Sequence, residues 1–270
     1  MRTIVHLSDL HFGRVDAALL DPLVDAVVRA RPDVVAISGD LTQRARNIQF
    51  LEARAFLDRL PTPQIVVPGN HDVPLYDVVR RFAGPLRRFR RHISRDLAPF
   101  HCDDTMAVIG INTARSLTFK NGRINARQVE TVAQRFAGLP ESILRVVVTH
   151  HPFDLPGKGE ENDVVGRSSS AMHTFAECGV DLFLSGHMHQ SHVSNTTRRY
   201  AIAGHSALIV QAGTASSTRG RGESNAFNVI RIEPTRIAVE TWGWQPGRNE
   251  FAMQQTAIHD KSESGWMSVS

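Results

Sequence analysis

Five short apolar runs, each followed at once by a polar motif, constrain the fold of this chain more than any other feature. The runs span residues 3–7, 33–38, 64–68, 143–149 and 180–185. They are rich in β-branched residues and lack polar alternation, which is typical of strands buried on both faces. Stretches with helical spacing lie between them, such as 17–30 and 47–60. Strands that alternate with helices predict βαβ units and a parallel sheet.

The polar motifs supply aspartate, asparagine and histidine side chains where the predicted strands end. They are Asp9-Leu10-His11, Gly39-Asp40, Gly69-Asn70-His71-Asp72, His150-His151 and Gly186-His187-Met188-His189. In parallel sheets the polar site lies beyond the carboxyl ends of the strands, so we expect all five motifs to converge on one rim. Gly39, Gly69 and Gly186 mark sharp strand exits where a ligand or metal can approach the backbone.

The number and type of these side chains suit two metal ions. Imidazole and carboxylate groups bind Mn, Fe and Zn alike, so they do not select one of these metals. Two adjacent metal ions with nitrogen and oxygen ligands are a device for phosphate ester hydrolysis. A single Asp or His at a strand end is usually a turn or cap residue. Five such motifs in this order, each after a strand, predict a binuclear metal site.

The motif series resembles the calcineurin-like metallophosphoesterase superfamily over residues 3–240. Within it, the chain looks most like the bacterial class III 3′,5′-cyclic nucleotide phosphodiesterases, through residues 38–41, 68–72 and 149–152. The resemblance implies an α/β fold, a four-layer α/β/β/α sandwich. It also implies one metallophosphoesterase domain over residues 1–255.

The resemblance implies a role for each motif residue. Asp9, His11 and His189 would bind one metal ion, Asn70, His150 and His187 the other, and Asp40 would bridge both. The two ions would be divalent or trivalent: Mn²⁺, Fe²⁺/Fe³⁺ or Zn²⁺. His71 would act as leaving-group acid or transition-state donor, and Asp72 would orient it. His151 would lie outside the ligand set, and an exchange of roles between His150 and His151 is the alternative.

A basic helical insertion is expected at about residues 74–98. On a helix, Arg80, Arg87, Arg88, Arg91 and Arg95 share one side, while Phe82, Leu86, Phe89 and Ile93 share another. Pro85 is expected to start a second helix there. A solvated basic face over a packed apolar one is one interpretation. The others are a lid that draws anionic substrate, a homodimer contact, or a patch for nucleic acid or a membrane surface.

Candidate substrate-binding residues lie in the loops beyond the motifs. Asn112 and Arg115 end a probable strand, Arg167 lies in the loop after His150, and His151 is a further candidate. Arg219 and Arg221 lie in a Gly- and Ser-rich loop. Arginine suits phosphate but also occurs on many protein surfaces, so ordinary loop charge is the alternative for each arginine.

The final third of the chain shows partial alternation separated by Gly, Asn and Pro, which predicts antiparallel strands. These span 191–196, 199–203, 208–212, 226–232 and 236–242. We expect them to form a second sheet packed face to face on the first. Residues 256–270 are polar and are interpreted as a C-terminal tail that can be disordered.

Composition is that of a soluble enzyme, with 41% hydrophobic and 21% charged residues among 270. No apolar run approaches the ~20 residues of a transmembrane helix. The first predicted ligand is already at residue 9, which leaves no room for a signal peptide. Cys102 and Cys178 have neither metal spacing nor a disulfide framework. We therefore expect a cytoplasmic protein.

The favoured function is hydrolysis of small anionic phosphodiesters, with 3′,5′-cyclic nucleotides as the type substrate. An alkoxide leaving group needs a proton, so the presence of His71 favours a diesterase. The alternatives are another ester, namely a UDP-diacylglucosamine-type pyrophosphate, a phosphomonoester or a nucleic acid. A non-catalytic scaffold is a remote alternative, because a scaffold has no physical need for seven converging metal ligands.

Overall fold

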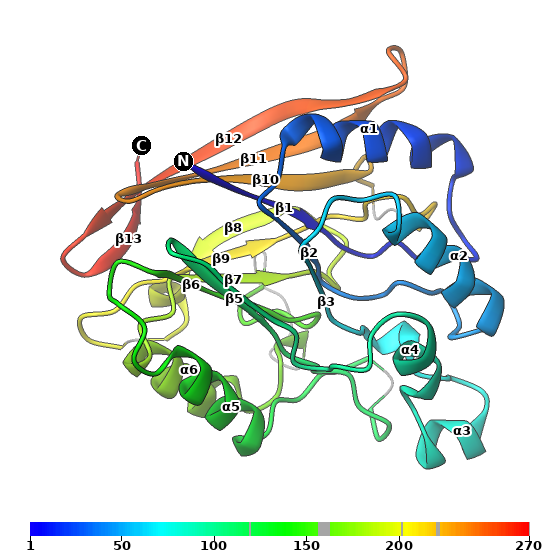
Figure 1. Ribbon diagram of the computed structural model, residues 1–270, viewed down its shortest axis with the longest axis horizontal. Coiled ribbons are helices and arrows are strands. Elements are labelled where there is room, and N and C mark those ends of the chain that lie inside the picture. Colours follow the sequence, from blue (N-terminus) through cyan, green and yellow to red (C-terminus); the bar gives the residue numbers. More distant parts are fainter. Residues whose placement is uncertain (119, 156–162, 201, 220–221, 270) are drawn as a thin grey trace.

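Two β-sheets pack face to face and carry helices on both outer faces in the computed structural model, which describes residues 1–270 except 119, 156–162, 201, 220–221 and 270 (Figure 1). The first sheet has the order β13 (Gly265–Ser268), β12 (Glu250–Ser262), β11 (Arg236–Gln245), β10 (Ala226–Glu233), β1 (Arg2–Leu7), β2 (Val34–Ile37) and β3 (Gln64–Val66). The second has the order β4 (Phe100–Cys102), β5 (Met106–Gly110), β6 (Leu144–Val148), β7 (Leu182–Ser185), β9 (Leu208–Gln211) and β8 (His192–Asn195).

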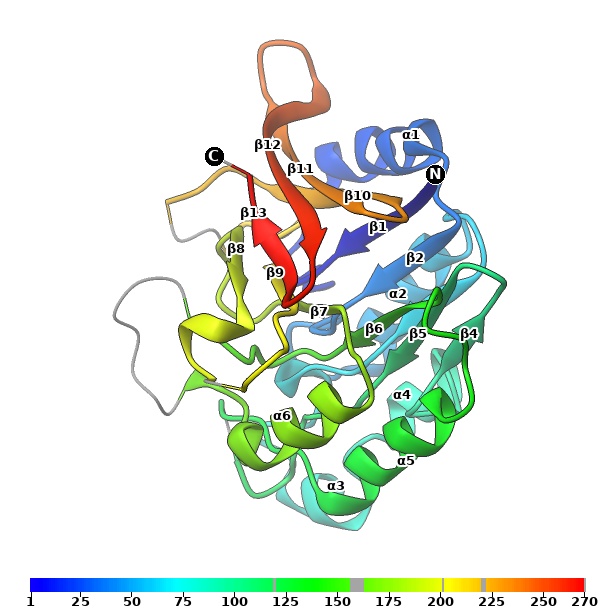
Figure 2. The ribbon, with the colours of Figure 1, turned by 90° about the vertical axis from the view of Figure 1, so that its left-hand side faces the viewer.

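The helices divide between the two outer faces. Beside the first sheet lie α1 (Leu20–Ala30) and α2 (Asn47–Leu57), and beside the second lie α5 (Ala126–Phe136) and α6 (Ser168–Glu177) (Figure 2). Two short helices, α3 (Val78–Ala83) and α4 (Arg87–His92), follow the third motif. Short 3₁₀ helices span Ala17–Leu19, Asn70–Asp72 and Thr196–Arg198. None of the helices in the described part of the chain is both long enough and apolar enough to cross a membrane.

Three apolar layers hold the four structural layers together. Side chains such as Ile4 and Val146 fill the space between the sheets. Leu23 of α1 packs against the outer face of the first sheet, and Phe175 of α6 packs against the outer face of the second. Full burial of one such side chain contributes about 1.5–3 kcal/mol. The α/β/β/α sandwich expected from the resemblance is therefore confirmed.

The expected division into a motif sheet and a C-terminal sheet is wrong. β1, β2 and β3 belong to the first sheet, whereas β6 and β7 belong to the second. The later strands also divide: β10 pairs antiparallel with β1, while β9 pairs parallel with β7. All of these strands are buried on both faces, so their hydrophobic pattern carries no information about which neighbour each one pairs with.

Two C-terminal expectations also fail. A strand was expected at residues 199–203, but the described residues of this range, 199–200 and 202–203, belong to no strand, and residue 201 lies outside the described residues. The segment expected as a polar tail continues β12 to Ser262 and forms β13. Trp266 fixes this segment, because its ring is buried between the sheets and its Nε1 donates to Asp181 at 2.9 Å.

The basic insertion forms two helices as expected, but the second starts at Arg87 rather than at Pro85. Phe89 and Leu86 pack into the core as the helical pattern predicts. Phe82 does not, because it is 57% exposed while its neighbour Arg81 is buried. The expected apolar side of the insertion is therefore correct for α4 and wrong for α3.

Candidate metal centre

The five motifs converge where both sheets present the carboxyl ends of their parallel strands. Asp9 and His11 follow β1, Asp40 follows β2, and Asn70 begins the 3₁₀ helix after β3. From the second sheet, His150 follows β6, and His187 and His189 follow β7. All of these side chains are buried except Asn70, which is half-buried. The expected single rim exists, but two sheets rather than one build it.

One cluster joins Asp9, His11 and His189. Asp9 Oδ1 lies 3.5 Å from His11 Nε2 and 3.3 Å from His189 Nε2, and these two nitrogens are 3.4 Å apart. Asp9 Oδ1 is buried and has no hydrogen-bond donor among the described residues. His189 Nδ1 lies 2.9 Å from Thr214 Oγ1, a contact that sets the ring orientation and that sequence patterns did not reveal.

A second cluster centres on His150. Its Nε2 lies 3.0 Å from Asn70 Oδ1 and 3.2 Å from His187 Nδ1. Its Nδ1 lies 2.8 Å from the carbonyl oxygen of Ser38, which can only accept, so Nδ1 carries the donated proton. His150 therefore presents Nε2 to the centre of the site. A protein carbonyl that fixes the tautomer in this way is the usual support of a metal-ligating histidine.

Asp40 connects the two clusters. Its Oδ2 lies 3.7 Å from His11 Nε2 and 3.4 Å from His150 Nε2, while its Oδ1 accepts from the backbone N–H of His71 at 2.8 Å. Burial would raise the pKa of Asp40, but nearby His150, His71 and His11 outweigh burial and hold it well below its usual range. One anionic oxygen thus faces both clusters.

The backbone is strained where the candidate ligands lie. Asp9, His11, Asp40, His187 and His189 all have positive φ angles between 51° and 73°. They are five of the nine non-glycine residues with positive φ in the described part of the chain. Such conformations cost about 1–3 kcal/mol each and persist only where the surrounding structure imposes them, which is typical of functional sites.

Glycine at the strand exits keeps the site compact. Gly39 has φ +93°, and a Cβ there would meet the backbone of Gly69 and the ring of His150. A Cβ on Gly186 would meet the side chains of Ser8 and Asp9. At these two turns other parts of the protein pack directly against the glycine backbone, and the approach of a metal or ligand there stays a prediction.

His71 lies beside the clusters and carries a partner that sequence reasoning did not assign to it. Its Nδ1 is 2.9 Å from the carbonyl oxygen of Gln43, and its Nε2 is 2.8 Å from Nη1 of Arg219. Because a carbonyl only accepts and a guanidinium only donates, His71 has its proton on Nδ1 and accepts at Nε2. Burial lowers the pKa of His71. The sequence had suggested that Arg219 contacts phosphate, but not that it pairs with His71.

Asp72 does not orient His71, contrary to the expectation. Its carboxylate accepts from the backbone N–H groups of Leu41, Thr42 and Gly69 at 2.9–3.1 Å and from the Thr42 hydroxyl at 2.9 Å. Asp72 therefore joins the second-motif loop to the third-motif loop, and Gln43 positions the His71 ring. The sequence could not show these partners of Asp72, because the order of residues along a loop does not tell which groups in space a carboxylate will meet.

His151 has both ring nitrogens engaged by protein atoms. Nε2 lies 2.9 Å from the carbonyl oxygen of Lys120, and Nδ1 lies 2.7 Å from Thr113 Oγ1. Burial and the neighbouring His187 and His150 hold the pKa of His151 well below its usual range. Although His151 lies close to His150 and His187, these contacts leave neither nitrogen free, and they favour His150 as the ligand.

The other candidate substrate residues do not all line one pocket. Asn112 and Arg115 line a pocket of about 480 Å³ beside α4. The Arg115 guanidinium donates to Arg123 O at 3.0 Å and to Gln128 Oε1 at 2.6 Å, so protein acceptors hold it in place. Arg167 instead lines a groove between α5 and α6. A role in substrate binding for these residues stays a prediction.

The residues present fit metal ions by their own chemistry. Within the described residues, three groups have potential ligand atoms close together: Asp9 with His11 and His189; Asp9 with Asp40 and His150; and His150 with His151 and His187. In the third group, Lys120 and Thr113 already engage both nitrogens of His151. Asp9 Oδ1, which has no hydrogen-bond donor among the described residues, and the imidazole nitrogens of His11 and His189 that face it form a donor set for a metal ion. Mixed nitrogen and carboxylate donors are those preferred by Mn, Fe and Zn.

Comparisons with known proteins agree with this chemistry. Residues 2–191 match the family described as calcineurin-like phosphoesterase. Over 209 residues the chain is 24% identical to a Synechococcus sp. protein named probable cyclic nucleotide phosphodiesterase, covering 71% of this chain and 74% of that protein. Over 80 residues it is 34% identical to glycerophosphodiester phosphodiesterase GpdQ of Enterobacter lignolyticus, covering 26% of this chain and 29% of GpdQ. The second match thus spans less than a third of GpdQ.

The fold is also shared with a solved structure. Purple acid phosphatase from yellow lupin superposes with a TM-score of 0.73 at 11% identity, over 95% of this chain and 53% of that one. The family match itself runs from β1 past β7 and so includes every motif that converges on the candidate metal centre. This chain therefore belongs to the calcineurin-like phosphoesterases and is a metal-dependent phosphoester hydrolase.

Proposed function

We propose that this protein is a binuclear metal-dependent phosphodiesterase that hydrolyses small anionic diesters. The observation that carries the proposal is the position of Asp40 Oδ2, which faces His11 in one cluster and His150 in the other. Asp9, His11 and His189 would hold one ion, Asn70, His150 and His187 would hold the second, and Asp40 would be shared between them. Bound metal ions supply the Lewis acidity and the activated water that phosphoester hydrolysis requires.

His71 acts on the leaving group. Its Nδ1–H bond to Gln43 fixes the ring, so that Nε2 faces the site, where a proton can be passed to the departing alkoxide. Arg219 occupies that nitrogen before substrate is bound. A guanidinium has five donors, so Arg219 can turn to a phosphate oxygen when the diester enters and leave Nε2 free. Nε2 then takes up a proton from solvent, and the ring passes this proton to the leaving alkoxide and returns to its neutral form with the proton on Nδ1.

The proposed substrate class is that of 3′,5′-cyclic nucleotides and similar small diesters. The names of the two curated relatives both describe phosphodiesterases, one of cyclic nucleotides and one of glycerophosphodiesters. His71 supports a diester, because the alkoxide released from a ribose or glycerol needs a proton.

The test is a panel of initial rates with Mn²⁺-loaded protein. It contains cyclic AMP, cyclic GMP, 2′,3′-cyclic AMP, bis-p-nitrophenyl phosphate, p-nitrophenyl phosphate, UDP-diacylglucosamine and single-stranded DNA. Highest kcat/KM on the 3′,5′-cyclic nucleotides supports the proposal. Turnover of the aryl diester together with UDP-diacylglucosamine or DNA, but not of cyclic nucleotides, contradicts the substrate class and leaves the metal chemistry intact.

A further inference from the structure

Helix α3 (Val78–Ala83) buries one of its two arginines, Arg81, and exposes its large apolar residues. Arg81 is 3% exposed, and its guanidinium donates to the carbonyl oxygens of Ser116, Pro74 and Thr118 at 2.6, 2.9 and 2.6 Å. The helix therefore turns its opposite side to solvent. A buried arginine that is well supplied with acceptors makes this orientation stable rather than accidental.

The exposed side of this segment is apolar. Tyr76, Val78, Val79, Phe82 and Leu117 are 57–84% exposed. Leu117 lies in the loop next to α3, because Arg81 binds the carbonyl groups of the residues on both sides of it. We call these five residues the α3 apolar face. Large apolar side chains gathered in this way on one surface mark an interaction site.

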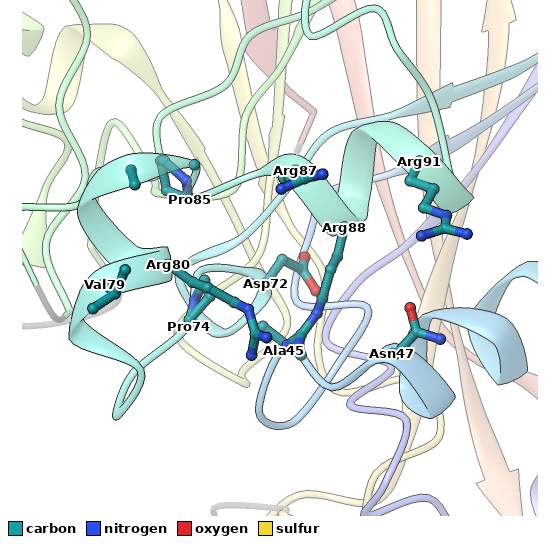
Figure 3. Close-up of a pocket in the computed structure, with 12 residues that line it drawn as sticks. Ala45, Asn47, Asp72, Pro74, Val79, Arg80, Pro85, Arg87, Arg88 and Arg91 are labelled. Atoms are coloured by element: carbon teal, nitrogen blue, oxygen red, sulfur yellow. The ribbon is translucent and has the colours of Figure 1, made fainter.

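A basic pocket adjoins the α3 apolar face. It has a volume of about 470 Å³ and is lined by Val79 together with Arg80, Arg87, Arg88 and Arg91 (Figure 3). Arg80 pairs with Asp77 at 2.6 Å, and Arg88 donates to the carbonyl oxygen of Ala45 at 2.6 Å. Among the described residues, no ion pair is recorded for Arg87 or Arg91, and both are exposed.

We propose that the α3–α4 segment docks onto an anionic phospholipid membrane. The α3 apolar face enters the interfacial region, and the arginines of the adjoining pocket bind headgroup phosphates. Apolar side chains flanked by basic ones are the combination that holds a protein at such a surface. In both views α3 lies at one end of the molecule, opposite the β11–β12 hairpin, so nothing in the described fold blocks its approach to a flat surface (Figures 1 and 2).

The charge and the side-chain types of the α3–α4 segment favour an anionic membrane over a second copy of the chain or a single-stranded nucleic acid. A second copy of the chain placed face to face would bring two arginine clusters together, which repel one another. Single-stranded nucleic acid is held by aromatic rings on which bases stack. The α3 apolar face has two rings, Tyr76 and Phe82, but its other three residues, Val78, Val79 and Leu117, offer no stacking surface, whereas hydrocarbon accepts all five side chains.

The test is co-sedimentation of the full-length protein with vesicles of phosphatidylcholine alone or of equal parts phosphatidylcholine and phosphatidylglycerol. We expect binding to the anionic vesicles only, weakened by salt. The Arg87→Gln/Arg91→Gln variant reduces the partition coefficient about 30-fold, because each basic side chain near an anionic surface contributes about fivefold. The Val79→Ser/Phe82→Ser variant reduces it at least about tenfold. All of these side chains are exposed, and circular dichroism checks that each variant is folded.

The matched controls are Met253→Ser and Arg248→Gln, which remove an exposed apolar and an exposed basic side chain at the β11–β12 end. Both retain wild-type partition. Loss of binding in the arginine variant alone, with Val79→Ser/Phe82→Ser unchanged, overturns insertion of the apolar face. So does a dimer in sedimentation velocity that the same serine variant dissociates. The result is independent of the phosphodiesterase proposal, because vesicle binding requires neither metal ions nor turnover.

Discussion

Replacing Arg219 with alanine tests how the site recognises a diester. The guanidinium lies 2.8 Å from His71 Nε2 and is half-buried. If it turns to a phosphate oxygen in the complex, its loss removes one hydrogen bond between charged groups, worth about 1.5–3 kcal/mol. This corresponds to a fall of about 10- to 150-fold in kcat/KM.

The assay compares cyclic AMP, which has an alkoxide leaving group, with bis-p-nitrophenyl phosphate, which has an aryl one. The Arg219 variant loses a similar factor on both, because the phosphate oxygens are common to the two substrates. An Arg248→Ala variant, which removes an equal charge from the distant hairpin, retains normal rates. A loss below about twofold on both substrates refutes the phosphate contact. A loss confined to cyclic AMP also refutes it, because Arg219 would then act only through His71.

Four further predictions address the remaining roles. His71→Ala slows cyclic AMP turnover about 10²- to 10⁴-fold and aryl diesters far less, and equal losses on both contradict the acid role. Asp72→Ala lowers the free energy of unfolding in urea by about 3–5 kcal/mol, because it strands three backbone N–H groups, and a loss below about 1 kcal/mol contradicts this. Burial would lower the pKa of His150, but Asp40 outweighs burial and raises it to about 9 in the metal-free protein. Metal binding must displace that proton, so affinity by isothermal titration falls about tenfold for each pH unit below 9, and pH-independent affinity contradicts this. Trp266→Ala lowers the free energy of unfolding by about 3–5 kcal/mol in the same urea assay, and an unchanged free energy contradicts a structural role for this residue.

Local chemistry made most of the metal centre predictable. Where a predicted strand ends in Gly39-Asp40 or Gly186-His187, a few residues indicate the carboxyl end of the strand, the sharp turn after it and a candidate metal ligand. The structure brings these side chains together. Roles that depend on loop geometry were not predictable in this way. Gln43 rather than Asp72 positions His71, and the partner of His71 comes from the loop after β9.

The pairing of strands that are far apart in the chain was also not predictable from the sequence. β1 and β6 have the same buried, β-branched pattern, yet they belong to different sheets, because register and neighbour depend on contacts far apart in the chain. β12 and β13 are rich in polar residues, so neither strand was predicted, although Trp266 of β13 is buried between the sheets. In α3, the helical pattern predicted that Phe82 would be buried. Arg81 is buried instead, because its guanidinium donates to three backbone carbonyl groups.

The central claim is that Asp40 bridges two metal ions that perform diester hydrolysis. The most direct measurement is the metal content per chain, by mass spectrometry of elements after reconstitution and gel filtration, for wild type and Asp40→Ala. An Asp21→Ala variant, changed at an exposed carboxylate of α1, serves as control. We predict two ions in the wild type and the control, and at most one in Asp40→Ala, which also loses turnover of bis-p-nitrophenyl phosphate. Two ions and near-normal turnover in Asp40→Ala would contradict the bridging role and with it the proposed mechanism.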